Sequence, residues 1–221
     1  PVRKGKEEEI VTEWEGDTLQ NAKYLKLDIL GLKTLTIIKD TIDAVGLTND
    51  FMYNIPLDDE KVFEYFRSGK NETVFQLESE GMKSLLLRIQ PKNIDDINNI
   101  VALHRPLPLS TGGTEKFCKI RNNELSIEST HPFIDDILLP TLGIPLYQEQ
   151  VIKIFNRLGL SKGEADLLRR YSEQMNQEKI DYYINKITAS SKTGLSKEEL
   201  AKIIKKISDY AGYLFNYSHS I

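Results

Sequence analysis

Residues 196–210 read Ser-Lys-Glu-Glu-Leu-Ala-Lys-Ile-Ile-Lys-Lys-Ile-Ser-Asp-Tyr, and this stretch predicts an amphipathic helix. Ser196 and Glu199 form a capping box, which is typical of the first turn of a helix. Apolar residues then recur every three or four positions and share one stripe. They are Leu200, Ile203, Ile204, Ile207 and Tyr210. The stretch therefore favours a helical fold.

The same spacing of apolar residues, every three or four positions, recurs through most of the chain before this helix. Ser161 and Glu164 form a second capping box, Ser79 and Asp58 are candidate N-caps, and Gly46 is a candidate C-terminal glycine. Pro145 is placed as a first-turn proline of the helix that precedes Gly159. The expected helices cover residues 35–45, 58–68, 79–90, 93–103, 146–158, 161–170 and 196–210.

Two regions depart from the helical period. Tyr24–Leu30 alternates apolar and polar residues, which predicts a half-buried strand ending at Gly31, and Ile10-Val11 indicates an edge strand or extended arm. Residues 104–145 hold five of the eight prolines, so we expect much of this region to be loop. The predicted class is mostly α with a little β at the start.

Composition excludes several classes of function. The chain has 221 residues, one cysteine and three separated histidines, so an internal disulfide and a Cys-built zinc site are excluded. We expect no secretory signal and no transmembrane segment. The formal net charge of −4 does not favour nucleic acid, although six lysines against two glutamates make residues 183–206 locally +4.

Four positions carry residue types suited to phosphate or metal chemistry. Asp28 suits a divalent-metal ligand or a solvated strand residue, and Arg169-Arg170 suit a phosphate or a solvated helix end. Arg105 opens the proline-rich region, where it holds a ligand or forms a tight turn. The string 215–220 contacts base or phosphate or ends in a frayed turn.

A binding module is the alternative from a different class. Residues 151–175 outline a helix, a Gly-Leu-Ser turn and a second helix that carries both arginines. This is the outline of a helix-turn-helix, whose second helix would enter a DNA major groove. Any pair of helices joined by a glycine turn gives the same outline.

Six strings, in order from Leu25 to the end of the chain, resemble motifs of one family. Ala102–Leu109 is similar to A-L-x-R-P-G-P-L, and Phe215–Ser220 is similar to F-N-K-S-H-S. The others are Leu25–Thr36, Thr73–Met82, Thr141–Val151 and Gly163–Arg170. Together they resemble the bacterial replicative DNA polymerases of family C, the α subunit of DNA polymerase III.

The resemblance implies a role for each matched residue. Asp28 would be catalytic and metal-binding, as the third of three acids that hold two Mg²⁺ ions in the whole enzyme. Lys26 and Lys33 would contact the DNA backbone. The residues expected to bind nucleotide are Arg105, Arg169, Arg170, Asn216, Ser218 and His219.

The resemblance also implies an organisation and partners. Residues 1–33 would end a nucleotidyltransferase-type palm, and 34–221 would be an incomplete fingers domain. The implied function is replicative, template-directed nucleotidyl transfer, with primer–template DNA, dNTP and replisome subunits such as a sliding clamp as partners. The implied location is cytoplasmic, with no membrane partner.

Departures from the family pattern limit this expectation. The upstream string that carries the other two metal acids does not occur here, so the chain is expected to be an inactive fragment that holds no Mg²⁺ alone. Leu107 replaces a glycine, Tyr217 replaces a lysine, and Tyr171 and Gln174 stand in a stretch that loses a basic run. A catalytically inactive, polymerase-like scaffold is therefore a further alternative.

Overall fold

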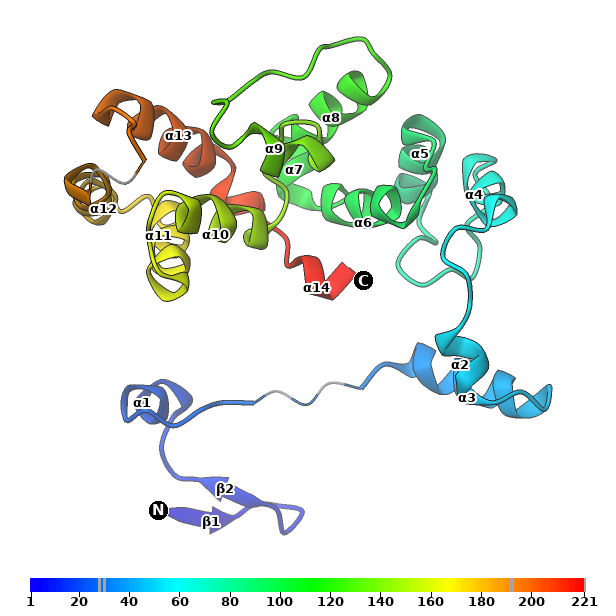
Figure 1. Cartoon of the computed structure of the whole chain (residues 1–221). Coiled ribbons are helices and arrows are strands. Elements are labelled where there is room, and N and C mark those ends of the chain that lie inside the picture. Colours follow the sequence, from blue (N-terminus) through cyan, green and yellow to red (C-terminus); the bar gives the residue numbers. More distant parts are fainter. Residues whose placement is uncertain (28, 30, 191–192, 221) are drawn as a thin grey trace. The chain divides into compact units, whose positions relative to one another are not determined.

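The computed structural model describes residues 1–27, 29, 31–190 and 193–220. Contacts within the chain divide it into two units, Pro1–Ile55 and Pro56–Ile221. Figure 1 shows helices along most of the chain and two short strands near its N-terminus. The predicted class, mostly α with a short N-terminal β element, is confirmed.

The first unit begins with a two-stranded hairpin. β1 (Val2–Lys4) pairs antiparallel with β2 (Ile10–Thr12), so a strand at Ile10-Val11 is confirmed. Three helices follow, α1 (Gly16–Asn21), α2 (Lys33–Ala44) and α3 (Asn49–Tyr53). α2 ends just before Gly46, whose φ of 71° is the left-handed conformation that ends many helices.

The strand predicted over 24–30 is wrong for the residues of it that the structure describes. Leu25, Leu27 and Ile29 lie outside any strand and are 82%, 77% and 98% exposed. An alternating pattern marks two faces, but a strand also needs a partner for its backbone hydrogen bonds. Both described strands pair with each other, which leaves no partner among the described residues. Asp28 and Leu30 lie outside the described residues.

The second unit is built from helices. Its elements are α4 (Glu60–Arg67), α5 (Glu80–Ile89), α6 (Ile94–Leu103), α7 (Pro106–Ser110), α8 (Gly113–Arg121), α9 (Asp135–Leu138), the 3-10 turn η1 (Leu139–Thr141), α10 (Gln148–Arg157), α11 (Lys162–Glu173), α12 (Gln177–Ser190), α13 (Lys197–Tyr210), the 3-10 turn η2 (Ala211–Tyr213) and α14 (Tyr217–Ser220). Among described residues, no helix is both long and apolar enough to cross a membrane.

Local capping chemistry explains where these helices begin. The Ser79 side chain accepts from Met82 N, and the capping boxes at Ser161 and Ser196 are both formed. The N-cap of α4 is Asp59, which accepts from Lys61 N, so the prediction of Asp58 is wrong by one residue. Both positions carry an acid, so residue type alone does not select between them.

The loop expected over much of 104–145 is present in part, since residues 122–134 and 142–145 lie outside helices. The rest of the region is largely helical, and Pro106 stands at the first position of α7, where a proline is tolerated. Gly112, with φ of 82°, then separates α7 from α8. Pro145 is not in a first turn, because α10 begins three residues later at Gln148 with Tyr147 as its N-cap.

Two hydrophobic clusters form the core of the second unit. The first is formed by the helices α9, α10, α11, α12 and α13, and it contains Phe155, Leu168 and Ile203, all fully buried. The second joins α4, α5, α6 and α8 and is centred on Leu86, Ile100 and Phe117. Residues from the end of the chain, among them Phe215 and Tyr217, pack on this second cluster. The C-terminal segment therefore lies against the earlier half of the unit.

Candidate nucleotide interface

The end of the chain is docked by a short backbone bridge. Phe215 N donates to Leu146 O at 2.7 Å, and Gln148 N donates to Phe215 O at 2.8 Å, so Tyr147 and Phe215 form a parallel bridge. α14 follows at once and contacts α6 (Figure 1). Residues 215–220 are thereby placed beside α6 and the start of α10.

Arg105 connects the proline-rich segment to the end of the chain. Its Nε donates to Ala102 O at 3.1 Å, its Nη2 donates to Tyr213 O, and its guanidinium lies 4.8 Å from the centre of the Phe215 ring. Burial lowers the pKa of this guanidinium. In the folded chain, Arg105 therefore fixes the backbone at Tyr213 and the ring of Phe215, just before Asn216.

Arg169 and Arg170 share one carboxylate partner. Asp166 lies 2.9 Å from Arg169 Nη2 and 2.9 Å from Arg170 Nη2, and Glu173 lies 3.4 Å from Arg169 Nη1. Arg169 is buried, whereas the Arg170 side chain is 61% exposed. Arg170 is the one of the two that is open to a ligand from solvent, although it also pairs with Asp166. α11 also contacts η2, which carries the Tyr213 carbonyl bound by Arg105.

The polar side chains of the C-terminal string are exposed and mutually bonded. Asn216 Oδ1 accepts from Ser218 Oγ at 2.6 Å and from His219 N at 3.1 Å. The His219 ring packs on the Phe215 ring with centroids 5.6 Å apart. Asn216, Ser218 and His219 all face solvent, so each can meet a ligand.

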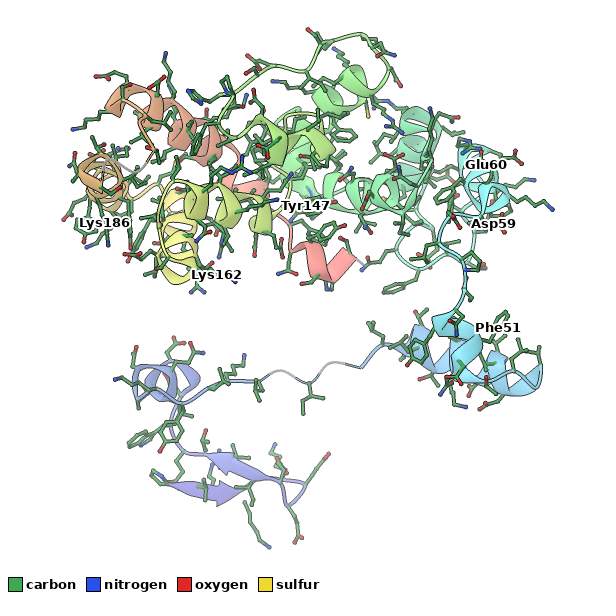
Figure 2. All side chains as sticks on the ribbon, viewed as in Figure 1. Phe51, Asp59, Glu60, Tyr147, Lys162 and Lys186 are labelled. Atoms are coloured by element: carbon green, nitrogen blue, oxygen red, sulfur yellow. The ribbon has the colours of Figure 1, made fainter. Side chains whose placement is uncertain are left out.

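A network of tyrosines and acids lies behind this string. Tyr147, labelled in Figure 2 at the start of α10, is buried and donates to Asn99 Oδ1 at 2.8 Å. Burial is the main cause of a strongly raised pKa of this phenol. Tyr217 donates to Asp95 Oδ1 at 2.9 Å, and this bond raises the Tyr217 pKa. These side chains line a cavity of about 260 Å³.

The proposed palm residues belong to the other unit. Lys26 and Lys33 are exposed, and Lys33 is the first residue of α2. Asp28 lies outside the described residues. Among residues that are described, no three His, Cys, Asp or Glu side chains come together as a metal site would require.

Two of the departures noted in the sequence take part in packing. Tyr171 packs against the first core cluster, with its ring 6.3 Å from that of Tyr183. Leu107 lies against Gly212, where an added Cβ would come within 3.1 Å of its Cδ2. Both side chains therefore take part in packing, and a glycine at position 107 would not provide the contact that Leu107 makes.

The helix-turn-helix outline is present as a pair of packed helices. α10 and α11 pack together, but α11 also contacts α12, α13 and η2. A recognition helix must expose one face to the groove. Arg169 is buried and Arg170 is exposed, so only Arg170 of the two arginines could face a groove.

Sequence reasoning did not single out three of the residues that organise the site. Asp166 stands three and four positions before the two arginines, and that helical spacing was a usable signal. Asp95 and Tyr147 gave no such signal, because their partners are 122 and 48 residues away. Only the fold brings these groups together.

Comparisons with known proteins place the chain in a family. The family model described as "Bacterial DNA polymerase III alpha subunit finger domain" matches residues 34–193. The chain is 36% identical over 227 residues to the DNA polymerase III subunit alpha of Aquifex aeolicus, covering all of this chain and 20% of that protein. The corresponding protein of Haemophilus influenzae is 38% identical over 228 residues, covering 95% of this chain and 19% of that protein.

The relative from Escherichia coli strain K12, of the same name, is 37% identical over 224 residues, covering 95% of this chain and 19% of that protein. The chain thus spans about a fifth of the length of the curated relatives it matches. The family model covers well over half of the chain. The chain therefore belongs to the bacterial DNA polymerase III alpha subunit finger domain family.

Proposed function

We propose that this chain supplies the nucleotide-binding fingers, and the end of the palm, of a replicative DNA-directed DNA polymerase. Residues 1–33 would belong to the palm and 34–221 to the fingers. Because the chain spans about a fifth of its relatives, polymerisation is proposed for a longer protein. That protein would work on primer–template DNA and dNTP in the cytoplasm, with replisome subunits such as a sliding clamp.

One observation carries the nucleotide-binding part. Arg105 bonds to the Tyr213 carbonyl and stacks on Phe215, so a motif in the middle of the chain lies directly beside the C-terminal string. Exposed polar groups and an exposed arginine suit a triphosphate, whose charge is recognised by N–H donors. Asn216, Ser218 and His219, together with Arg170, would make direct contacts.

Arg105 and Arg169 enter the proposal differently. Both are held by internal partners, which are backbone carbonyls for Arg105 and carboxylates for Arg169. Binding a triphosphate with either guanidinium would require exchange of those partners for phosphate oxygens. A phosphate carries enough charge to compete with a carboxylate for arginine, which makes the exchange chemically reasonable.

The palm part rests on the family and on residue types. Asp28 would be a catalytic carboxylate that binds Mg²⁺ in the whole enzyme, with further acids supplied from outside the described residues. Lys26 and Lys33 would contact phosphates of the DNA backbone, which carries no base information and suits an enzyme that must copy any sequence.

Nucleotide titration of the chain tests the fingers proposal. Arg170→Ala should weaken dNTP binding about tenfold to a hundredfold, since a charge-assisted phosphate contact is worth roughly 1.5–3 kcal/mol. Arg88→Ala is the matched control, because Arg88 is also an arginine paired with one acid, Glu115. Equal affinity of wild type and Arg170→Ala would remove Arg170 from the interface.

Primer extension tests the palm proposal and the scaffold alternative. The assay uses a polymerase that carries this chain, with Asp28→Asn compared against Asp40→Asn. Loss of extension only in Asp28→Asn supports a catalytic carboxylate. Equal extension by both variants removes Asp28 from the mechanism, and no extension by the unmutated protein favours the inactive scaffold.

A further inference from the structure

Tyr217 is fastened to two other elements at three points. Its hydroxyl donates to Asp95 Oδ1 of α6 at 2.9 Å, and its backbone N donates to Glu149 Oε2 of α10 at 3.0 Å. Its ring meets the Tyr147 ring edge-on, with centroids 4.8 Å apart. These contacts join residue 217 to parts of the chain that lie 122, 68 and 70 residues away.

The surface that receives Tyr217 is itself fixed. Tyr147 is 5% exposed and bonds to Asn99 Oδ1. The residues on either side of Tyr147 hold Phe215 through backbone hydrogen bonds, one from Phe215 N to Leu146 O at 2.7 Å and one from Gln148 N to Phe215 O at 2.8 Å. A buried, hydrogen-bonded ring keeps one rotamer, so it offers a defined place for a second ring. Phe215 and Tyr217 are therefore anchored on either side of Asn216.

The helix that Tyr217 begins has little stability of its own. α14 has four residues, and a single helical turn does not persist in water without tertiary contacts. Its exposed groups, at Ser218 and His219, are oriented by the turn and by Asn216 Oδ1. Loss of the anchor at 217 would therefore release the polar groups proposed to meet nucleotide.

We propose that Tyr217 is a positioning residue that sets the C-terminal string for nucleotide binding without touching the nucleotide. The inference rests on the proposed function of that string. It also changes the meaning of the substitution at this position, where resembling sequences carry lysine. The side chain at 217 is directed to Asp95, so in this chain the position makes an internal contact and no contact with phosphate is needed from it.

The position of Asp95 indicates which contact a lysine at 217 would make. An ammonium that reached Asp95 would form an ion pair in place of the phenol hydrogen bond, and both would tether α14 to α6. Tyrosine adds ring packing on Tyr147, which lysine does not provide. We therefore expect a lysine at 217 to hold α14 in this chain as the tyrosine does.

Two readouts on the chain test the proposal. In Tyr217→Phe, the His219 amide should exchange with solvent about threefold to tenfold faster, because one hydrogen bond to a charged acceptor is lost. The dissociation constant for a dNTP should rise by a similar factor. Tyr217→Ala should enlarge both effects, and Tyr217→Lys should restore both. Tyr53→Ala, which removes an 85% exposed tyrosine in the other unit, is the control.

A variant at the partner residue separates positioning from general destabilisation. In an Asp95→Ala background, Tyr217→Phe should have no further effect on exchange at His219, because the bond it removes is already gone. The unfolding midpoint of the chain in urea, measured on the same samples, reports any global loss of stability.

Each outcome bears on the proposal separately from the function of the string. Unchanged exchange at His219 in Tyr217→Ala overturns the positioning role. Faster exchange with an unchanged dissociation constant overturns the link to nucleotide. If the wild-type chain binds no dNTP, the proposed function fails, and exchange at His219 still decides whether Tyr217 orders the string.

Discussion

Gly81 and His104 approach so closely that a side chain at position 81 would displace the imidazole: a Cβ there would lie 2.2 Å from His104 Nε2. Gly81 is the second residue of α5, and Gly163 is the second residue of α11, where an added Cβ would meet nothing within 4 Å. The two glycines therefore form a matched pair with opposite expectations.

We predict that Gly81→Ala destabilises the chain and Gly163→Ala does not. The first change should cost about 1–3 kcal/mol, because the part-buried imidazole must move. The second should stabilise by about 0.5–1 kcal/mol, because alanine restricts the unfolded chain. Urea denaturation measures both. Similar midpoints for the two variants would contradict the close contact at His104.

Arg105→Lys should destabilise the second unit by about 1–2 kcal/mol, since a lysine cannot serve two carbonyls and stack on a ring at once. The bonds at stake run to Ala102 O and Tyr213 O, with Phe215 beneath the guanidinium. Arg88→Lys serves as control, because its one acid partner accepts either cation. Equal unfolding midpoints for the two variants would remove Arg105 from the tether.

The two neighbouring arginines of α11 should differ in their contribution to stability. Arg169→Ala leaves Asp166 and Glu173 without a buried partner and should cost about 2 kcal/mol. Arg170→Ala removes an exposed pair and should cost about 0.5 kcal/mol or less. Thermal unfolding of both variants checks this order. The reverse order would show that Arg169 is not held as the structure has it.

Glu164 gives the chain an acid-sensitive contact. A hydrogen bond from Lys186, followed by bonds from Ser161, lowers the pKa of this carboxyl from 4.5 to about 2. The carboxylate is therefore favoured in the folded state, and its contribution is present above pH 4.5 and is lost as the pH falls to about 2. Figure 2 labels Lys186 on α12, the helix beside α11.

Glu164→Gln should therefore lower stability near pH 7 and have little effect near pH 2. The neutral amide keeps the capping geometry but loses the ion pair. Urea midpoints measured from pH 7 to pH 2 follow the difference between variant and wild type. Lys186→Met is the companion variant. In a chain that carries it, the difference in urea midpoint between Glu164→Gln and the unchanged Glu164 should be smaller. A gap that stays constant with pH would contradict the lowered pKa.

Short-range chemistry was readable from the sequence, and the helix starts show why. Ser79, Ser161 and Ser196 cap the helices expected of them, because each cap is a contact within three residues. The prediction at Asp58 was off by one, since Asp59 offers the same carboxylate. The strand at 24–30 was wrong among its described residues, because pairing depends on a partner that alternation does not supply.

The residues of the candidate site also fall into two groups, those that are exposed and those that are held by internal partners. Arg170, Asn216, Ser218 and His219 are exposed, as nucleotide ligands need to be, and the resemblance had marked all four. It had marked Arg105 and Arg169 equally, yet their guanidinium groups are held by carbonyls and carboxylates inside the fold. Residue type indicates what a side chain can bind, but burial and competing partners decide what it binds.

The sequence by itself determined the helical class, the positions of the capping boxes and the family, because these depend on residue type and near spacing. Tertiary structure alone decided that Tyr217 bonds to Asp95 and that Arg105 lies against Phe215. Those pairs are 122 and 110 residues apart. Contacts over such separations form only when packing of the apolar clusters offsets the entropy of closing the intervening chain.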